Sequence, residues 1–147
     1  MYIFILAHCI FLSILAYGKN NDLDVFIVDS EKLIATKTDN KLVGNVNRGR
    51  QIFSSRKVNC LSCHEAPIKE EKFHGNFGPS LSGIGAIYNK DEIRLRVINS
   101  KIINPNSIMP SYFIKINFPR TPKKYSNKTI LSPQEVEDLV EYLYSLR

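Results

Sequence analysis

The sequence has few residues of the types that most often carry chemistry. It contains three cysteines, three histidines and two methionines among 147 residues. One cysteine, Cys9, lies in an apolar N-terminal run that we expect to be removed, which leaves Cys60 and Cys63 as the only thiols. The remaining chain therefore has no disulfide framework to build and no third thiol.

Other features are missing as well. There is no internal repeat, no pairing of a nucleophile with a base, and no interleaved aromatic and basic platform, so we expect no nucleic-acid partner. The glycine-rich segment 73–85 lacks a preceding strand and the G-K-[ST] signature of a phosphate-binding loop. The formal net charge of +6 is itself compatible with acidic proteins, acidic membrane surfaces or nucleic acid.

The N-terminal apolar run lacks the length of a membrane span. Residues 3–15 read IFILAHCIFLSIL, shorter than the roughly 20 residues that a span needs. Small residues follow, so we predict that residues 1–18 form a cleaved signal peptide. No lysine or arginine precedes the run, which keeps an uncleaved anchor as the alternative. Lipid attachment at Cys9 is disfavoured because apolar residues continue after it.

The predicted destination follows from the same run. No twin arginine is present, so we expect export by the general secretory route to the periplasm. After cleavage we expect no stable membrane insertion.

What is present centres on a C-x-x-C-H motif at residues 60–64, within the segment NCLSCH of residues 59–64. Such a pair of thiols can bind zinc, act as a redox dithiol or attach haem. A zinc site needs four ligands, and the chain offers that many: Cys60, Cys63, His64 and His74. Cys63 and His64 are adjacent, however, and chelation of one ion by two adjacent residues is strained. A redox dithiol would begin a helix after a strand in a βαβ pattern, and no such pattern surrounds the motif.

Histidine directly after the second cysteine is typical of haem attachment. The two thiols add to the two vinyl groups of haem, and His64 ligates the iron. A single motif predicts one covalently bound haem c.

Met109 is the candidate for the sixth position on the iron. It lies beside a proline in NPNSIMPSYF, residues 104–113, where a rigid backbone would hold its thioether towards the metal. Burial as an ordinary hydrophobic residue is the alternative. His74 is the competing ligand, but it follows His64 too closely to reach the opposite face easily.

Three helices are expected around this motif. The first spans 47–55 with Asn47 as its N-cap, and the second spans 90–100. In the second, one face is apolar and two arginines lie off that face: Ile93, Val97 and Ile98 on it, Arg94 and Arg96 elsewhere.

The last helix has the clearest start signal, with Ser132 as N-cap, Pro133 at the first position and Glu135 closing a capping box. We expect its apolar face to cross the first helix near Gly49 and Phe53. Residues 25–28 form either a short strand or an extended run, and segment 73–85 is expected to be a loop wrapping the haem.

Residues 116–128 form a basic, proline-bearing loop. Two interpretations remain open: a solvated loop, or a docking surface beside the haem edge.

These elements resemble, in type and order, a class I cytochrome c: a helix, C-x-x-C-H, a G-P-x-L loop, a helix, a Met-Pro loop and a C-terminal aromatic helix. GRQIF, FHGNFGPSLSGIG, VINSKIINPNSIMPSYF and ILSPQEVEDLVEYLYSLR are further similar to the SoxX family, the monohaem subunits of sulfur-oxidising SoxAX cytochromes. The resemblance implies an all-α, single-domain fold of a few helices wrapped around one haem. Residues 45–147 would be the cytochrome c domain and residues 19–44 an N-terminal extension.

The resemblance also implies site residues. Cys60 and Cys63 would be the thioether anchors, and His64 and Met109 the axial ligands. The carbonyl of Pro79 would accept a hydrogen bond from the His64 imidazole and fix its tautomer.

The resemblance implies a function shared between chains. A SoxA-like haem subunit would hold the catalytic site of an L-cysteine S-thiosulfotransferase, which joins thiosulfate oxidatively to a cysteine of a SoxYZ-like carrier. This chain, with no free cysteine after haem attachment, would be non-catalytic and pass electrons to a soluble acceptor. A free-standing periplasmic electron carrier is the rival function, and a haem-based ligand sensor, which needs an open sixth site, is disfavoured by Met109.

Overall fold

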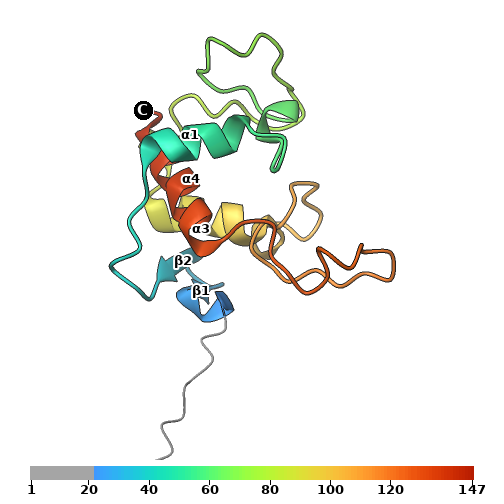
Figure 1. Cartoon of the computed structure of the whole chain (residues 1–147). Helices are drawn as coiled ribbons and strands as arrows, with labels where there is room; N and C mark the ends of the chain where they lie inside the picture. The colour runs from blue at the N-terminus through green and yellow to red at the C-terminus, as the bar shows by residue number, and fades with distance from the viewer. Residues whose placement is uncertain (1–21) are drawn as a thin grey trace, which may run out of the picture.

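The computed structural model describes residues 22–147, so the predicted signal peptide lies outside the described residues. Within this range there are four α-helices: α1 (Val46–Ser54), α2 (Ile84–Ile87), α3 (Lys90–Asn99) and α4 (Pro133–Ser145). Short 3-10 turns lie at Asp22–Val25, Cys60–Ser62 and Ser100–Ile102. Helix α4 packs against both α1 and α3 (Figure 1).

The N-terminal extension contains a small sheet, which corrects the expectation of an all-α fold. Strands β1 (Phe26–Asp29) and β2 (Ile34–Lys37) pair antiparallel. The turn between them is closed by the Asp29 carboxylate, which accepts hydrogen bonds from two backbone N–H groups at 2.9 and 3.1 Å. Two-stranded sheets are marginal alone, and this one is supported because β2 packs on α3 and buries Ala35 completely.

Helix α1 begins slightly earlier than predicted. Its N-cap is Asn45, whose side chain accepts a hydrogen bond from Arg48 N at 2.9 Å, so the expectation that Asn47 is the cap is wrong. The backbone N–H of Asn45 also donates to Asp138 at 2.8 Å. The start of α1 is therefore fixed by α4 as well as by local capping.

The predicted crossing of the first and last helices is confirmed. A Cβ atom at Gly49 would overlap the backbone carbonyl of Asp138, so only glycine allows the two backbones to approach this closely. Further along, the rings of Phe53 and Tyr142 pack with centroids 5.5 Å apart.

Helix α4 starts as the sequence indicates. Ser132 is the N-cap, Pro133 occupies the first turn, and Glu135 completes a capping box. Its apolar residues are buried, and two of them, Leu139 and Leu143, line the central cavity.

Helix α3 is confirmed in position, but not in its exposure pattern. Arg94 was expected off the apolar face, yet it is only 2% exposed. The reason is that α3 is covered by α4 on one side and by β2 on another. Arg94 pairs with Glu137 of α4 at 2.5 and 3.0 Å and donates to the carbonyl of Ala35 in β2 at 2.6 Å.

Candidate cofactor site

The helices enclose a cavity of about 500 Å³, within the roughly 300–1,000 Å³ of pockets that hold small molecules and cofactors. Its wall is mainly apolar and draws on α1, α3, α4 and the loops between them. Side chains typical of this wall are Phe53, Leu81, Ile93, Val97, Leu139 and Leu143. The fold therefore leaves its own centre open for a large apolar group.

The C-x-x-C-H motif forms a tight turn on one side of this cavity. The backbone N–H groups of Cys63 and His64 both donate to the carbonyl of Cys60, at 3.1 and 3.0 Å. This single turn places both cysteines and the histidine among the lining residues.

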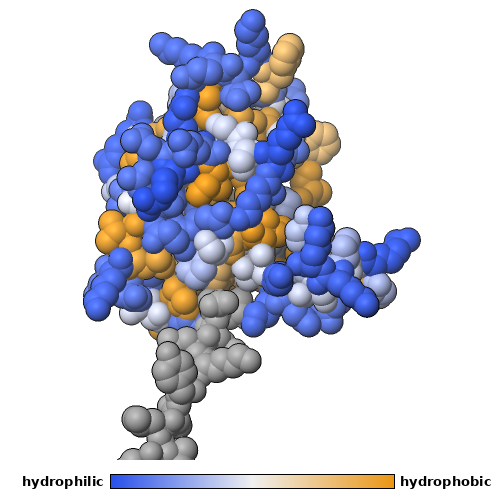
Figure 2. All heavy atoms as spheres, viewed as in Figure 1, coloured by the Kyte–Doolittle hydropathy of each residue, from blue (hydrophilic) through white to orange (hydrophobic). Residues whose placement is uncertain are grey.

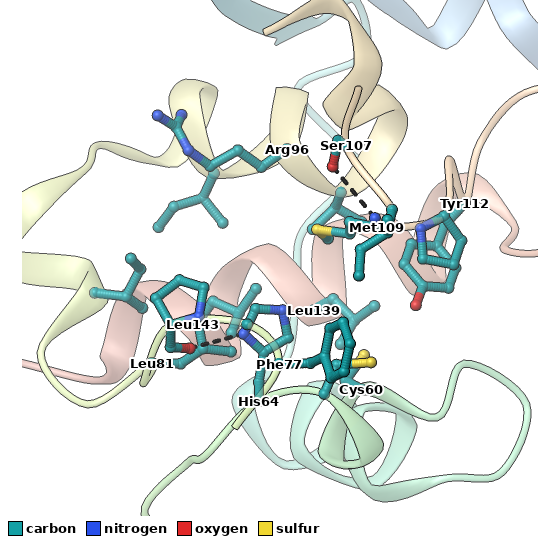
Figure 3. Close-up of a pocket in the computed structure, with 18 of the residues that line it drawn as sticks. Cys60, His64, Phe77, Leu81, Arg96, Ser107, Met109, Tyr112, Leu139 and Leu143 are labelled. Atoms are coloured by element: carbon teal, nitrogen blue, oxygen red, sulfur yellow. Dashed lines mark hydrogen bonds between the residues drawn. The ribbon is translucent and has the colours of Figure 1, made fainter. Parts of the chain in front are cut away.

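The His64 ring is held in one tautomer. Its Nδ1 lies 2.8 Å from the carbonyl oxygen of Pro79, and because a carbonyl can only accept, Nδ1 must carry the proton. The other ring nitrogen, Nε2, then has a free lone pair and faces the cavity (Figure 3). This is the contact that the family resemblance implies for Pro79.

Gly78 lets the chain pass close to that ring. A Cβ atom there would overlap the imidazole of His64. The N–H of Gly78 donates to Cys63 O at 2.7 Å, so the G-P turn and the motif brace each other. The imidazole thus has little freedom to turn away from the cavity.

Met109 lies on the opposite side of the cavity from His64 (Figure 3). Its backbone is held twice: its N–H donates to Ser107 Oγ at 3.2 Å, and its carbonyl accepts from Ser100 Oγ at 3.0 Å. The thioether therefore projects from a fixed support. A nitrogen donor and a sulfur donor face each other across an apolar space, and such a pair would suit the iron of a bound haem.

The competing histidine is elsewhere. His74 is not among the residues that line the central cavity; it borders a separate one of about 310 Å³ together with Glu65 and Glu71. Its Nδ1 accepts a hydrogen bond from the N–H of Ala66 at 3.3 Å. The arrangement favours Met109 over His74 as the ligand opposite His64.

The environment of Cys60 bears on the dithiol alternative. Burial raises the pKa of the Cys60 thiol to about 11, although a contact with Tyr112 partly opposes the shift. Reactive redox dithiols usually have a lowered cysteine pKa. The raised pKa of Cys60 therefore does not favour that use. The hydroxyl of Tyr112 donates to Val58 O at 2.9 Å and supports the segment that leads into Cys60.

Arg96 is a site residue that the sequence reasoning missed. It is the one lysine or arginine among the described residues that line the cavity. Its guanidinium stacks 3.7 Å from the ring centroid of Tyr88 and donates to Glu92 O at 2.9 Å. The available signal was its position three residues after Ile93, which places both on neighbouring parts of one helix face.

The donor set fits a covalently attached haem. Two thiols, an imidazole with a free nitrogen and an opposing thioether meet at an apolar cavity that carries one guanidinium. A haem has vinyl groups for the thiols, an iron for the axial donors and carboxylates that a cation can balance.

Three comparisons with known proteins bear on this site. The family model for cytochrome c matches residues 46–147. A solved structure, the crystal structure of SoxXA from P. pantotrophus, superposes with a TM-score of 0.70 at 25% identity, covering 82% of this chain and 93% of that one. An uncharacterized lipoprotein of Aquifex aeolicus (strain VF5) is 28% identical over an alignment of 137 residues, which covers 84% of this chain.

The chain spans 60% of the length of that lipoprotein. Among residues 22–147, none of the helices has the length and apolar character needed to cross a membrane.

Proposed function

Because this chain belongs to the cytochrome c family and is of the SoxX type, we propose that it is the electron-transfer subunit of a periplasmic heterodimer that oxidatively couples thiosulfate to a cysteine of a carrier protein. The observation that carries this proposal is the likeness to SoxXA over 93% of that chain. Haem c, the cofactor of this family, supplies one-electron chemistry when bound.

We propose that Cys60 and Cys63 hold one haem through thioether bonds, and that His64 and Met109 ligate its iron. Pro79 keeps the imidazole in the tautomer whose Nε2 can bind a metal, since Nδ1 donates to its carbonyl. A thioether as the second ligand favours a higher reduction potential than a second imidazole would.

The remaining wall sets the surroundings of the site. Its apolar side chains exclude water, and a drier site strengthens every charge interaction within it. We propose that Arg96 balances the negative carboxylates that haem carries, because a buried anion is costly without a partner. The ring of Tyr88 and the carbonyl of Glu92 hold that guanidinium in place.

The sulfur chemistry is assigned to the partner subunit. Once Cys60 and Cys63 are joined to haem, the exported chain has no thiol left to carry a sulfane or to attack thiosulfate. We propose a SoxA-like partner that bears the catalytic site, a SoxYZ-like carrier that approaches through the complex, and a soluble acceptor that receives the electrons.

Export is part of the proposal. We propose that residues 1–18 are removed on the general secretory route, leaving the chain in the periplasm. The mass of the protein recovered from its host tests this. A mass without residues 1–18 supports cleavage, whereas an intact N-terminus or a lipid adduct on Cys9, as in a lipoprotein, would overturn it.

Ligation can be tested separately from the partner. Met109→His should lower the midpoint potential, because imidazole replaces a thioether on the iron. His74→Ala is the matched control and should leave the potential and the visible spectrum unchanged. If His74→Ala alters the spectrum and Met109→His does not, the assigned ligand is wrong.

The function itself is tested on tagged protein recovered with its haem from its native periplasm. A second haem protein should co-purify in fixed ratio, and thiosulfate together with the carrier protein should reduce the preparation. If the chain elutes alone and exchanges electrons readily with respiratory proteins, it is a free-standing carrier instead.

A further inference from the structure

A basic arm, residues 114–130, projects from the body of the protein. Figure 1 shows this orange segment extending away from the helices, between the end of the Met109 segment and the start of α4. The arm is closed at its root, where Leu131 N donates to Tyr112 O at 3.0 Å, and above it, where Ile116 bridges Lys128. It is therefore a folded projection and not simply a connection.

The charge of the arm is of one sign. It carries four lysines and one arginine and no aspartate or glutamate: Lys115, Arg120, Lys123, Lys124 and Lys128. All five side chains are exposed, and Figure 2 shows the projection as largely hydrophilic. None of the ion pairs found among residues 22–147 includes one of them. The arm thus concentrates positive charge without neutralising it.

Two aromatic side chains stand exposed among these cations. Phe118 is 69% and Tyr125 is 58% exposed, and the ammonium of Lys124 lies 4.7 Å from the ring centroid of Tyr125. Neither ring belongs to the buried core. Exposed rings among lysines are the composition of protein segments that settle at the boundary between lipid headgroups and acyl chains.

We propose that the basic arm docks this protein peripherally on a membrane surface that contains anionic phospholipid. Lysine and arginine are attracted to the headgroups, and the two rings enter the interfacial layer. The docking is reversible, since it uses one loop and no spanning segment. No residue of the arm lines the central cavity.

Shape and composition favour lipid over an acidic protein. A stable protein interface buries about 800 Å² on each partner, and a single projecting loop offers little flat area. Lysine is depleted in protein interfaces relative to arginine, yet four of the five cations here are lysines. A bilayer needs no complementary shape, so a convex projection suits it.

The position of the arm in the fold also favours docking on a membrane. The ring of Phe26 packs edge-on against Phe113, at the root of the arm, with centroids 5.0 Å apart. Phe26 begins β1, shortly after the start of the described chain. The apolar run of residues 3–15 precedes it, so the chain enters the fold beside the arm. During export, while residues 1–18 are still attached, a chain held at the membrane by its N-terminus would present the arm to that same surface.

The test measures binding of the haem-loaded protein to vesicles of phosphatidylglycerol mixed with phosphatidylcholine, compared with phosphatidylcholine alone. The arm variant replaces four lysines by glutamine: Lys115, Lys123, Lys124 and Lys128. The control variant removes the same charge from exposed sites elsewhere: Lys41, Arg56, Lys69 and Lys72, each to glutamine. All proteins keep the same N-terminus, so any contribution of the N-terminus to vesicle binding is the same in each of them.

The arm variant should bind the anionic vesicles at least about tenfold more weakly than the unmodified protein. The control variant should lose much less of its affinity for the same vesicles. Salt should weaken binding of the unmodified protein, and Phe118→Ser with Tyr125→Ser should weaken it further at constant charge.

Equal losses in the arm and control variants would show attraction by net charge alone and overturn the proposal. So would vesicle binding that is unaffected in the arm variant, or an arm variant whose only defect is slower association with an acidic protein. Vesicle binding involves no electron transfer, so this outcome is independent of the function proposed above.

Discussion

The helical frame, made of α1, α3 and α4, and the basic arm use charge in opposite ways. In the frame, Asp138 and Glu137 are nearly inaccessible to solvent, and each meets an arginine, Arg48 or Arg94. In the arm, the cations are exposed and take part in none of the ion pairs of residues 22–147. We infer from this difference that the charges of the frame stabilise the fold, whereas the charges of the arm are available to bind another surface.

The largest expected effect comes from breaking the buried pair between α3 and α4. Arg94→Met leaves the buried Glu137 with only the more distant Lys37, at 3.8 Å, and should cost about 3–5 kcal/mol of unfolding free energy. Urea denaturation of the haem-loaded protein measures this. The double variant Arg94→Met with Glu137→Leu should recover much of the loss. A double variant as unstable as the single one would mean that the hydrogen bond to Ala35, and not the charge, is what matters.

Closing the gap between α1 and α4 should have the next largest effect. Gly49→Ala places a methyl group against the carbonyl of Asp138 and should destabilise the protein by about 2–3 kcal/mol, because the backbones must separate. By helix propensity alone the same change would add about 1 kcal/mol of stability, so the sign of the effect is diagnostic. Asn47→Ala, exposed on the same helix, should change the unfolding free energy by less than about 0.5 kcal/mol.

The charge of Asp138 should show itself through pH. Burial alone would raise the pKa of this carboxyl, but hydrogen bonds from Arg48, Gln134 and the Asn45 N–H lower it below its usual value. Ionised Asp138 therefore stabilises the folded protein at pH values above its pKa in the unfolded chain. This stabilisation is lost as the pH falls towards its lower pKa in the folded protein.

Asp138→Asn should accordingly cost about 2 kcal/mol near neutral pH and progressively less below about pH 4. Stability measured along an acid series checks this, with exposed Asp24→Asn as the control. Parallel curves for the Asp138 variant and the unmodified protein would mean that its ionised form contributes nothing.

The smallest effect is expected in the arm. The four-lysine variant described above should change the unfolding free energy by no more than about 0.5 kcal/mol, because its charges make no buried contact. Denaturation beside the control variant measures this. A clear loss of stability would contradict the contrast between the frame and the arm, because the charges of the arm would then also stabilise the fold.

The parts of the fold that the sequence predicted are those specified by short patterns. The capping box of α4 and the turn of C-x-x-C-H are local, so a few residues determine them. The hairpin and the burial of Arg94 were not predicted, because both depend on contacts between distant segments. Even the N-cap of α1 depends partly on a distant residue. Asn45, and not Asn47, caps the helix, and its backbone N–H donates to the Asp138 carboxylate.

The same limit applies to the site. Met109 could be proposed as a ligand because it is the one methionine beyond Met1. Arg96 was expected off the apolar face of its helix, and only the three-dimensional packing shows that it lines the cavity and stacks on Tyr88.

The contacts that tie the beginning of the fold to its end also set the order of events during synthesis. Asn45 and Arg48 bind Asp138 across 93 and 90 positions, and Arg94 reaches Glu137 across 43. A growing chain therefore cannot fix the start of α1 or pair Arg94 with Glu137 until the last fifteen or so residues have emerged. If the chain is exported as proposed, it would cross the membrane while still open, and the C-x-x-C-H segment would remain reachable for the proposed haem attachment. The final helix then acts as the step that closes the molecule.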